Sequence, residues 1–167
     1  MIKLIFILTT ILSISNVYAD LYVKVYKVVD GDTVRVVDEK GVRYKIRLVG
    51  IDAPEKKQPY GDESTKHLRG LVNGKWVTII SPTKSGLPYT IDRYQRVLGK
   101  IIIHNEDINY LQLLSGMAWH YKRYQKDQSI ADQQSYSLAE QEAQSKELGL
   151  WGSEESIAPW KWRRKNK

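Results

Sequence analysis

The sequence contains no cysteine, which excludes disulfide bonds, thiol catalysis and any zinc site with thiolate ligands. Long apolar runs are also scarce, and after the first twenty residues no segment is apolar enough to cross a membrane. The folded part of the chain must therefore be held together by its hydrophobic core, with a bound metal ion or ligand as the other available source of stability.

The one long apolar run is residues 4–14, directly after Lys3. A cation, a short apolar stretch and then small residues at Val17 and Ala19 are typical of a secretory signal peptide. A membrane anchor is the alternative, but the run is well short of the roughly 20 residues that span a bilayer. We expect a signal peptide over 1–19, and a secreted or periplasmic protein that has no membrane association after cleavage.

The chain is basic, with a formal net charge of +7 and a cluster of basic residues at its C-terminus. A basic exported protein attracts polyanions, and charge alone leaves nucleic acid, anionic lipid and acidic polysaccharide open. We expect one domain over 20–158. A basic tail over 159–167 follows it, which either keeps the protein soluble or contacts nucleic acid.

Periodicity predicts a domain that is rich in β-structure. Strand patterns occur over 21–29, 34–37, 42–49, 76–80 and 97–103. Helix patterns occur over 62–72, with Asp62 as the cap, and over 108–116 and 131–148. Residues 82–92 have the composition of a loop. Early hairpins and a late pair of strands favour an α+β fold, mainly β, built as a small Greek-key barrel with helices attached.

Three acidic residues stand at the ends of neighbouring strands. Asp32 lies in Asp-Gly-Asp-Thr, and Asp52 and Glu55 lie in Asp-Ala-Pro-Glu. Because neighbouring antiparallel strands bring such ends together, we expect the carboxylates at one rim of the barrel. Carboxylate oxygens without a nearby histidine or cysteine suit calcium or magnesium rather than zinc. The backbone carbonyl of Ala53 is a further ligand that calcium accepts readily.

Each acidic residue also has a simpler explanation, because Asp-Gly is common in hairpin turns and Asp before Ala-Pro can end a strand. Arg47 favours a functional interpretation, since its position implies burial beside the carboxylates and its guanidinium suits a phosphate or a carboxylate. Arg96, in Asp-Arg-Tyr-Gln-Arg, is a second candidate. One arginine could belong to a structural ion pair, whereas two arginines that face a metal site would fit hydrolysis of a phosphate ester.

The joint spacing of Asp30-Gly-Asp-Thr33, Arg47 and Asp52-Ala-Pro-Glu55 resembles the staphylococcal (micrococcal) nuclease family. The likeness continues through the Asp-Arg-Tyr-Gln-Arg block, Gly116-Met-Ala118 and Leu148-Gly-Leu-Trp151, so it covers nearly all of the chain after the signal peptide. Many relatives have glycine where this chain has Gln95, next to an unchanged arginine.

The resemblance implies a five-stranded OB-type barrel with three helices. It also implies a calcium-dependent endonuclease that hydrolyses DNA and RNA and leaves 3′-phosphate ends. In such an enzyme Asp32, Asp52 and the carbonyl of Ala53 would bind Ca²⁺ directly. Glu55 would contact the metal through water and act as general base.

The resemblance further implies that Arg47 and Arg96 hold the scissile phosphate and stabilise the charge of its transition state. Family members stack an aromatic side chain on the base, and the candidates here are Tyr124, which is preferred, and Tyr121. We expect a monomer that favours single-stranded or locally unpaired nucleic acid, because a base that has left the duplex stacks more easily.

Two other hypotheses remain at this stage. His120, Lys122 and Asp127 match the H-x-K-x4-D pattern of phospholipase D-type enzymes, in which the histidine is a covalent nucleophile and no metal is needed. The glycine- and serine-containing element that follows this pattern in those enzymes is missing here. Alternatively, the barrel could bind nucleic acid without cutting it, although all five charged residues expected of the nuclease are present.

Overall fold

The structure is a computed structural model that describes residues 20–81 and 89–166. The expected signal peptide over 1–19 and most of the expected loop over 82–92 lie outside the described residues. Within the described part of the chain, no helix combines the length and apolar character that a membrane span needs.

Five strands close a barrel, namely β1 (Leu21–Asp30), β2 (Thr33–Val37), β3 (Arg43–Leu48), β5 (Trp76–Ile80) and β7 (Val97–Ile103). They follow the order β3-β2-β1-β5-β7, and a parallel pairing of β3 with β7 completes the ring. Short strands β6 (Thr90–Ile91) and β8 (Glu106–Asp107) pair with β7. Strand β4 (Ile51–Asp52) pairs instead with β9 (Trp119–His120).

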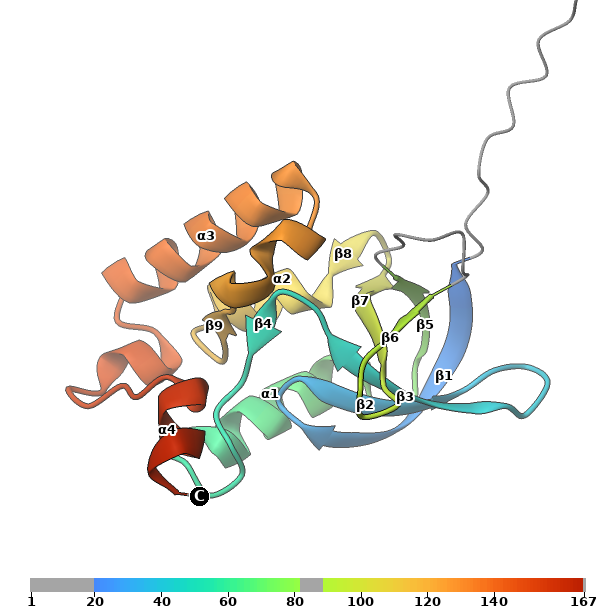
Figure 1. Cartoon of the computed structure of the whole chain (residues 1–167), viewed down its shortest axis with the longest axis horizontal. Coiled ribbons are helices and arrows are strands. Elements are labelled where there is room, and N and C mark those ends of the chain that lie inside the picture. The colour runs from blue at the N-terminus through green and yellow to red at the C-terminus, as the bar shows by residue number, and fades with distance from the viewer. Residues whose placement is uncertain (1–19, 82–88, 167) are drawn as a thin grey trace, which may run out of the picture.

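The helices gather on one side of the barrel (Figure 1). They are α1 (Gly61–Val72), α2 (Ile108–Leu114), α3 (Ile130–Ser145) and α4 (Pro159–Lys165), with 3-10 turns at η1 (Lys122–Asp127) and η2 (Gly149–Gly152). Figure 1 shows α4 close to the loop between β4 and α1, although more than a hundred residues separate these segments.

Alternation of apolar and polar residues sets the core, as the sequence predicts. Val23, Val25 and Val28 of β1 are buried, and they meet the inward residues of the other strands. Two register shifts in β1, between Val25 and Lys27 and between Val28 and Asp30, mark β-bulges. A bulge bends its strand and changes where side chains point, so β1 carries two consecutive outward residues, Tyr26 and Lys27.

The sequence-based fold class is confirmed, with five barrel strands at or within one or two residues of their expected bounds. The helices differ in their ends, since α2 stops at Leu114 rather than at residue 116 and α3 stops at Ser145 rather than at residue 148. Asp62 does not cap α1, because the helix begins one residue earlier, after Tyr60 in a left-handed conformation. The basic tail expected over 159–167 contains a fourth helix, α4, which Pro159 starts at a position where its missing N–H is harmless.

Two glycine-containing segments of the sequence, 116–118 and 148–151, contact each other. The backbone N–H of Leu150 donates to the Gly116 carbonyl at 2.9 Å. Gly116 has φ +65°, and a Cβ there would lie 2.1 Å from the carbonyl oxygen of Leu148. The segment that follows α3 is therefore joined to the segment that follows α2 by backbone packing that only glycine permits.

We predict that Gly116→Ala lowers the free energy of unfolding by at least about 2 kcal/mol, because it adds backbone strain and a clash with a carbonyl that cannot move freely. Gly70→Ala is the matched control, since a Cβ at Gly70 meets no atom within 4 Å. That variant should be stabilised by roughly 0.5–1 kcal/mol. Urea denaturation followed by tryptophan fluorescence measures both, and equal stability of the two variants would contradict the packing described.

Candidate active site

Arg47 joins two buried carboxylates at one rim of the barrel. Its Nη2 lies 3.1 Å from Asp32 Oδ2 and 2.9 Å from Asp52 Oδ1. Its Nη1 donates to the carbonyls of Leu48, at 2.7 Å, and Ile51, at 2.9 Å. The guanidinium is thus fixed from both sides, and two acidic side chains twenty residues apart face the same nitrogen.

The local backbone explains this convergence. Asp32 lies in the turn between β1 and β2, and Thr33 at the start of β2 is opposite Arg47 of β3. After β3, Gly50 with φ +74° turns the chain into β4, which contains Asp52. The side chain of Asp32 accepts a hydrogen bond from the backbone N–H of Ala53 at 2.8 Å. The ends of β1 and β3 and the whole of β4 therefore meet around one pair of carboxylates.

Burial of the two carboxylates carries a large desolvation cost. Asp52 is 1% exposed and Asp32 is 7% exposed. Burial raises the pKa of Asp52, and the hydrogen bond from Arg163 and the charge of Arg47 act against that rise. Asp30, beside them, has its pKa raised to about 7 by burial and by the charge of Asp32. A site with this much desolvated negative charge favours cations.

Arg163 of α4, which no motif in the sequence indicated, contacts the same carboxylates. Its Nη2 lies 2.8 Å from Asp52 Oδ2, and its Nη1 lies 2.7 Å from Glu55 Oε1. Although burial lowers the pKa of Arg163, its hydrogen bonds to Asp52 and Glu55 raise it on balance. Glu55 is therefore brought to the cluster with Asp52, but a second arginine occupies its carboxylate.

Helix α4 is held against the site by contacts on both sides. The side chain of Gln58, just after Glu55, donates to the carbonyl of Ile157 before the helix. The ring of Trp160 lies 5.4 Å from that of Tyr121 and 5.7 Å from that of Trp119.

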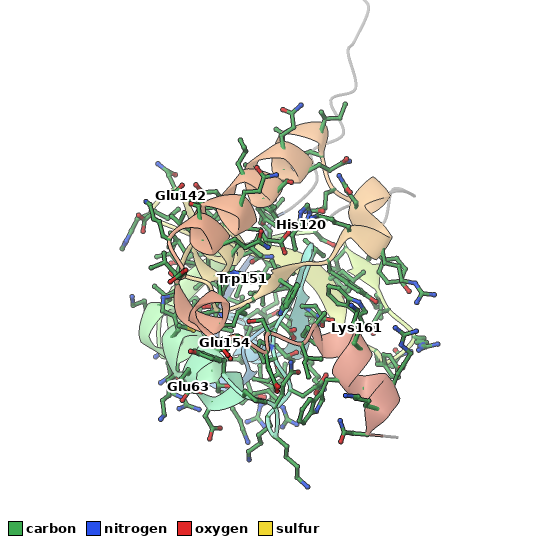
Figure 2. All side chains as sticks on the ribbon, turned by 90° about the vertical axis from the view of Figure 1, so that its left-hand side faces the viewer. Glu63, His120, Glu142, Trp151, Glu154 and Lys161 are labelled. Atoms are coloured by element: carbon green, nitrogen blue, oxygen red, sulfur yellow. The ribbon has the colours of Figure 1, made fainter. Side chains whose placement is uncertain are left out.

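Figure 2, in which Lys161 marks α4, shows the helix at the edge of the molecule. Two tryptophans within a basic segment were the available signal, because a fully solvated tail does not need them.

The oxygen atoms of the cluster fit a hard divalent cation. Asp32 and Asp52 supply carboxylates, and Ala53, which follows Asp52 and whose N–H binds Asp32, has a backbone carbonyl beside them in the sequence. No group of three or more histidine, cysteine or acidic side chains is arranged for a metal among residues 20–81 and 89–166. Two carboxylates completed by a carbonyl and water suit calcium or magnesium, which accept such oxygens, and do not suit zinc.

Arg96 lies apart from these contacts. It precedes β7, whose first residue, Val97, pairs with Ile46 next to Arg47. The Arg96 side chain, however, contacts Asp92, with Nε at 2.8 Å and Nη2 at 2.7 Å from Asp92 Oδ2. Although burial raises the pKa of Asp92, its hydrogen bonds from Arg96 lower it below the usual value. Arg96 would have to exchange this partner to meet a phosphate beside Arg47.

The two tyrosines predicted to stack on a base lie together near the cluster. Tyr121 directly follows β9, and its backbone N–H donates to the carbonyl of Gly50 at 2.8 Å. The Tyr124 ring is 5.5 Å from the Tyr121 ring and is 52% exposed. Tyr121 is covered on another side by Trp160. Of the pair, Tyr124 has the more accessible ring.

The phospholipase D pattern gains no support from the position of His120. This residue is 1% exposed, and its Nε2 is within 3.0 Å of Gln128 Oε1. Burial lowers its pKa. A nucleophile must reach a phosphate, and the side chain of His120, buried between its own strand and Tyr136 of α3, cannot do so without rearrangement.

Comparison with known proteins gives consistent results. A family model described as staphylococcal nuclease homologue matches residues 45–153. A protein named uncharacterized endonuclease from Escherichia coli is 39% identical over 147 residues, which cover 87% of this chain and 86% of that protein. Its namesake from Haemophilus influenzae is 38% identical over 144 residues, 86% of this chain and 74% of that protein. Staphylococcal-like nuclease CAN1 from Arabidopsis thaliana is 40% identical over 75% of this chain but 34% of its own length.

Proposed function

The chain belongs to the staphylococcal nuclease family, and we propose that it is an exported, calcium-dependent enzyme that leaves 3′-phosphate ends on DNA and RNA. As a member of that family it is a nuclease, a hydrolase of phosphodiester bonds. The observation that carries the proposal is the shared contact of Asp32 and Asp52 with one nitrogen of Arg47. It supports the proposal because two carboxylates that could bind a cation and a guanidinium that could bind a phosphate lie in one place.

Calcium is proposed because the donor atoms are hard oxygens from Asp32, Asp52 and the Ala53 carbonyl. Calcium bound there would supply positive charge against the phosphoryl oxygens. Two backbone carbonyls fix Nη1 of Arg47, and its Nη2 would have to exchange a contact with Asp32 or Asp52 to hold a phosphate. Arg96 would add a second guanidinium once it leaves Asp92.

Glu55 is the proposed general base. Its carboxylate would accept a proton from the attacking water, which requires that Arg163 release the Glu55 carboxylate.

Tyr124, with Tyr121 beside it, would stack on a base next to the cleaved bond. An exposed ring accepts an unpaired base more easily than a paired one, so single-stranded or locally unpaired substrates are favoured. Residues 1–19 would direct export and be removed as a signal peptide, and we expect the enzyme to be a monomer.

The direct test is digestion of denatured DNA and of RNA by the purified protein with Ca²⁺, with Mg²⁺ and with EGTA, followed by end-group analysis. We expect cleavage with Ca²⁺, loss of cleavage with EGTA, and 3′-phosphate products. Cleavage that continues in EGTA, or products with 5′-phosphates, would contradict the proposal.

Arg47→Ala and Arg96→Ala are each expected to lose at least about 100-fold in turnover, because each removes a donor aimed at the transition-state charge. Arg47→Ala should also melt at a lower temperature, since it leaves two buried carboxylates without their cation, so turnover is measured below that temperature. Arg69→Ala, which changes an exposed arginine of α1, is the matched control and should keep wild-type turnover. Steady-state kinetics on denatured DNA measure all three. Near-normal turnover in either site variant would overturn its assigned role.

Arg163→Gln is expected to raise the affinity for Ca²⁺ by about fivefold, since a partly exposed ion pair contributes up to about 1 kcal/mol and competes for the same carboxylates. Arg164→Gln, one residue further along α4, removes the same charge without these contacts. Calorimetric titration with Ca²⁺ in the absence of substrate separates the two variants. If Arg163→Gln binds Ca²⁺ no better than Arg164→Gln, the competition does not exist.

A further inference from the structure

A row of three cations crosses neighbouring strands on the outer face of the barrel. Lys27 of β1 is directly opposite Arg35 of β2, and Arg35 is directly opposite Lys45 of β3. All three side chains are exposed. None of them forms an ion pair with another described residue of the chain.

Such a row of like charges lowers the stability of the fold when no anion is bound to it. Neighbouring strands lie about 4.7–4.9 Å apart, and like charges directly opposite each other destabilise a sheet. Acidic residues that could balance the row are missing from the strands themselves, because β2, β3 and β5 contain no aspartate or glutamate. In β1 the single acidic residue is Asp30, at the end nearest the candidate active site. The arrangement is therefore complementary to a polyanion.

Exposed aromatic rings accompany these cations. The bulge in β1 turns Tyr26 outward next to Lys27, and the Arg43 guanidinium lies 5.6 Å from the centre of the Tyr26 ring. Further along the same face, Tyr22 stacks on Trp76 with ring centres 5.1 Å apart and an interplanar angle of 18°. Large exposed rings interleaved with cations are the usual surface for single-stranded nucleic acid, whose bases present free faces.

The same face continues into the candidate active site. In β3 the buried residues Ile46 and Leu48 alternate with Arg43, Lys45 and Arg47 on the other face. Alternate residues of a strand are about 6.6–6.8 Å apart, so Lys45 is one such step from Arg47 and Arg43 is two. In Figure 1 the turn that joins β2 and β3 extends away from the helices and past β1.

We propose that this face is a binding track for the single-stranded part of the substrate that extends beyond the cleaved bond. Lys27, Arg35 and Lys45 bind consecutive phosphates of that strand. Tyr26 and the stacked pair at the N-terminal end of β1 contact its bases. The inference rests on the proposed nuclease function of the site at Arg47, and it adds where the rest of a long substrate lies.

The first test is binding of a fluorescent single strand of about twelve nucleotides in EGTA, measured by anisotropy over a range of salt concentrations. Arg35→Gln/Lys45→Gln removes two track cations, and Lys66→Gln/Arg69→Gln on α1 removes two exposed cations elsewhere. We expect the slope of log affinity against log salt to fall by about 1.4 in the track variant, for two lost phosphate contacts. The α1 variant should keep the wild-type slope.

Weaker binding by the track variant cannot result from unfolding, because removal of opposed like charges should leave its melting temperature unchanged or higher. A third variant, Tyr26→Leu, keeps an apolar side chain and all cations. It should weaken binding of the single strand by about fivefold or more through lost stacking. Equal slopes in the wild-type, track and α1 proteins would overturn the proposal. A track variant that no longer binds anionic phospholipid vesicles but still binds the oligonucleotide as the wild-type protein does would also overturn it.

The second test is cleavage in Ca²⁺ of a dinucleotide and of the longer strand. The track variant should lose about tenfold in kcat/KM on the longer strand, the factor that corresponds to 1.36 kcal/mol, and keep its rate on the dinucleotide. If the wild-type protein binds the longer strand with the expected slope but cleaves neither substrate, the track stands and the proposed function falls. If it cleaves both and the track variant cleaves both equally well, the track falls and the proposed function stands.

Discussion

The guanidinium of Arg47 lies between Asp32 and Asp52, two carboxylates that are almost completely removed from water. Two buried like charges are costly unless a cation with good hydrogen-bond geometry accompanies them. The carbonyls of Leu48 and Ile51 fix that cation through its second nitrogen. The β1–β2 turn, the end of β3 and the short strand β4 can therefore take their observed positions only together, and the rest of the site is arranged around them.

Much of this could be predicted from the sequence, for identifiable reasons. The barrel strands are clear because alternating residues such as Val23 and Val25 carry the core pattern. The convergence of Asp32 with Asp52 follows from their places at neighbouring strand ends, and the structure brings both to Arg47. Helix caps were less predictable, since Asp62 has the right chemistry for a cap but Tyr60 precedes the helix in a left-handed conformation.

Contacts between distant segments could not be predicted. Arg163 meets Asp52 across 111 residues, and no periodicity in a short basic segment indicates where its helix docks. The partner of Arg96 is local, four residues away, yet a carboxylate and a phosphate are equally suitable for a guanidinium. The cationic row on the outer face depends on register, because Lys27 meets Arg35 only through the bulge in β1. At this rim of the barrel, Asp32 and Asp52 are buried and cations surround them.

If Asp32 and Asp52 form one cation site beside Arg47, the loss of either carboxylate must weaken the binding of Ca²⁺. The decisive measurement is calorimetric titration of Ca²⁺ into the wild-type protein and into Asp52→Asn, without substrate. We expect one bound ion per wild-type chain and binding at least about tenfold weaker in the variant, because a charged oxygen ligand is lost. Equal affinity in the two proteins, or no binding of Ca²⁺ by the wild-type chain, would rule out this site.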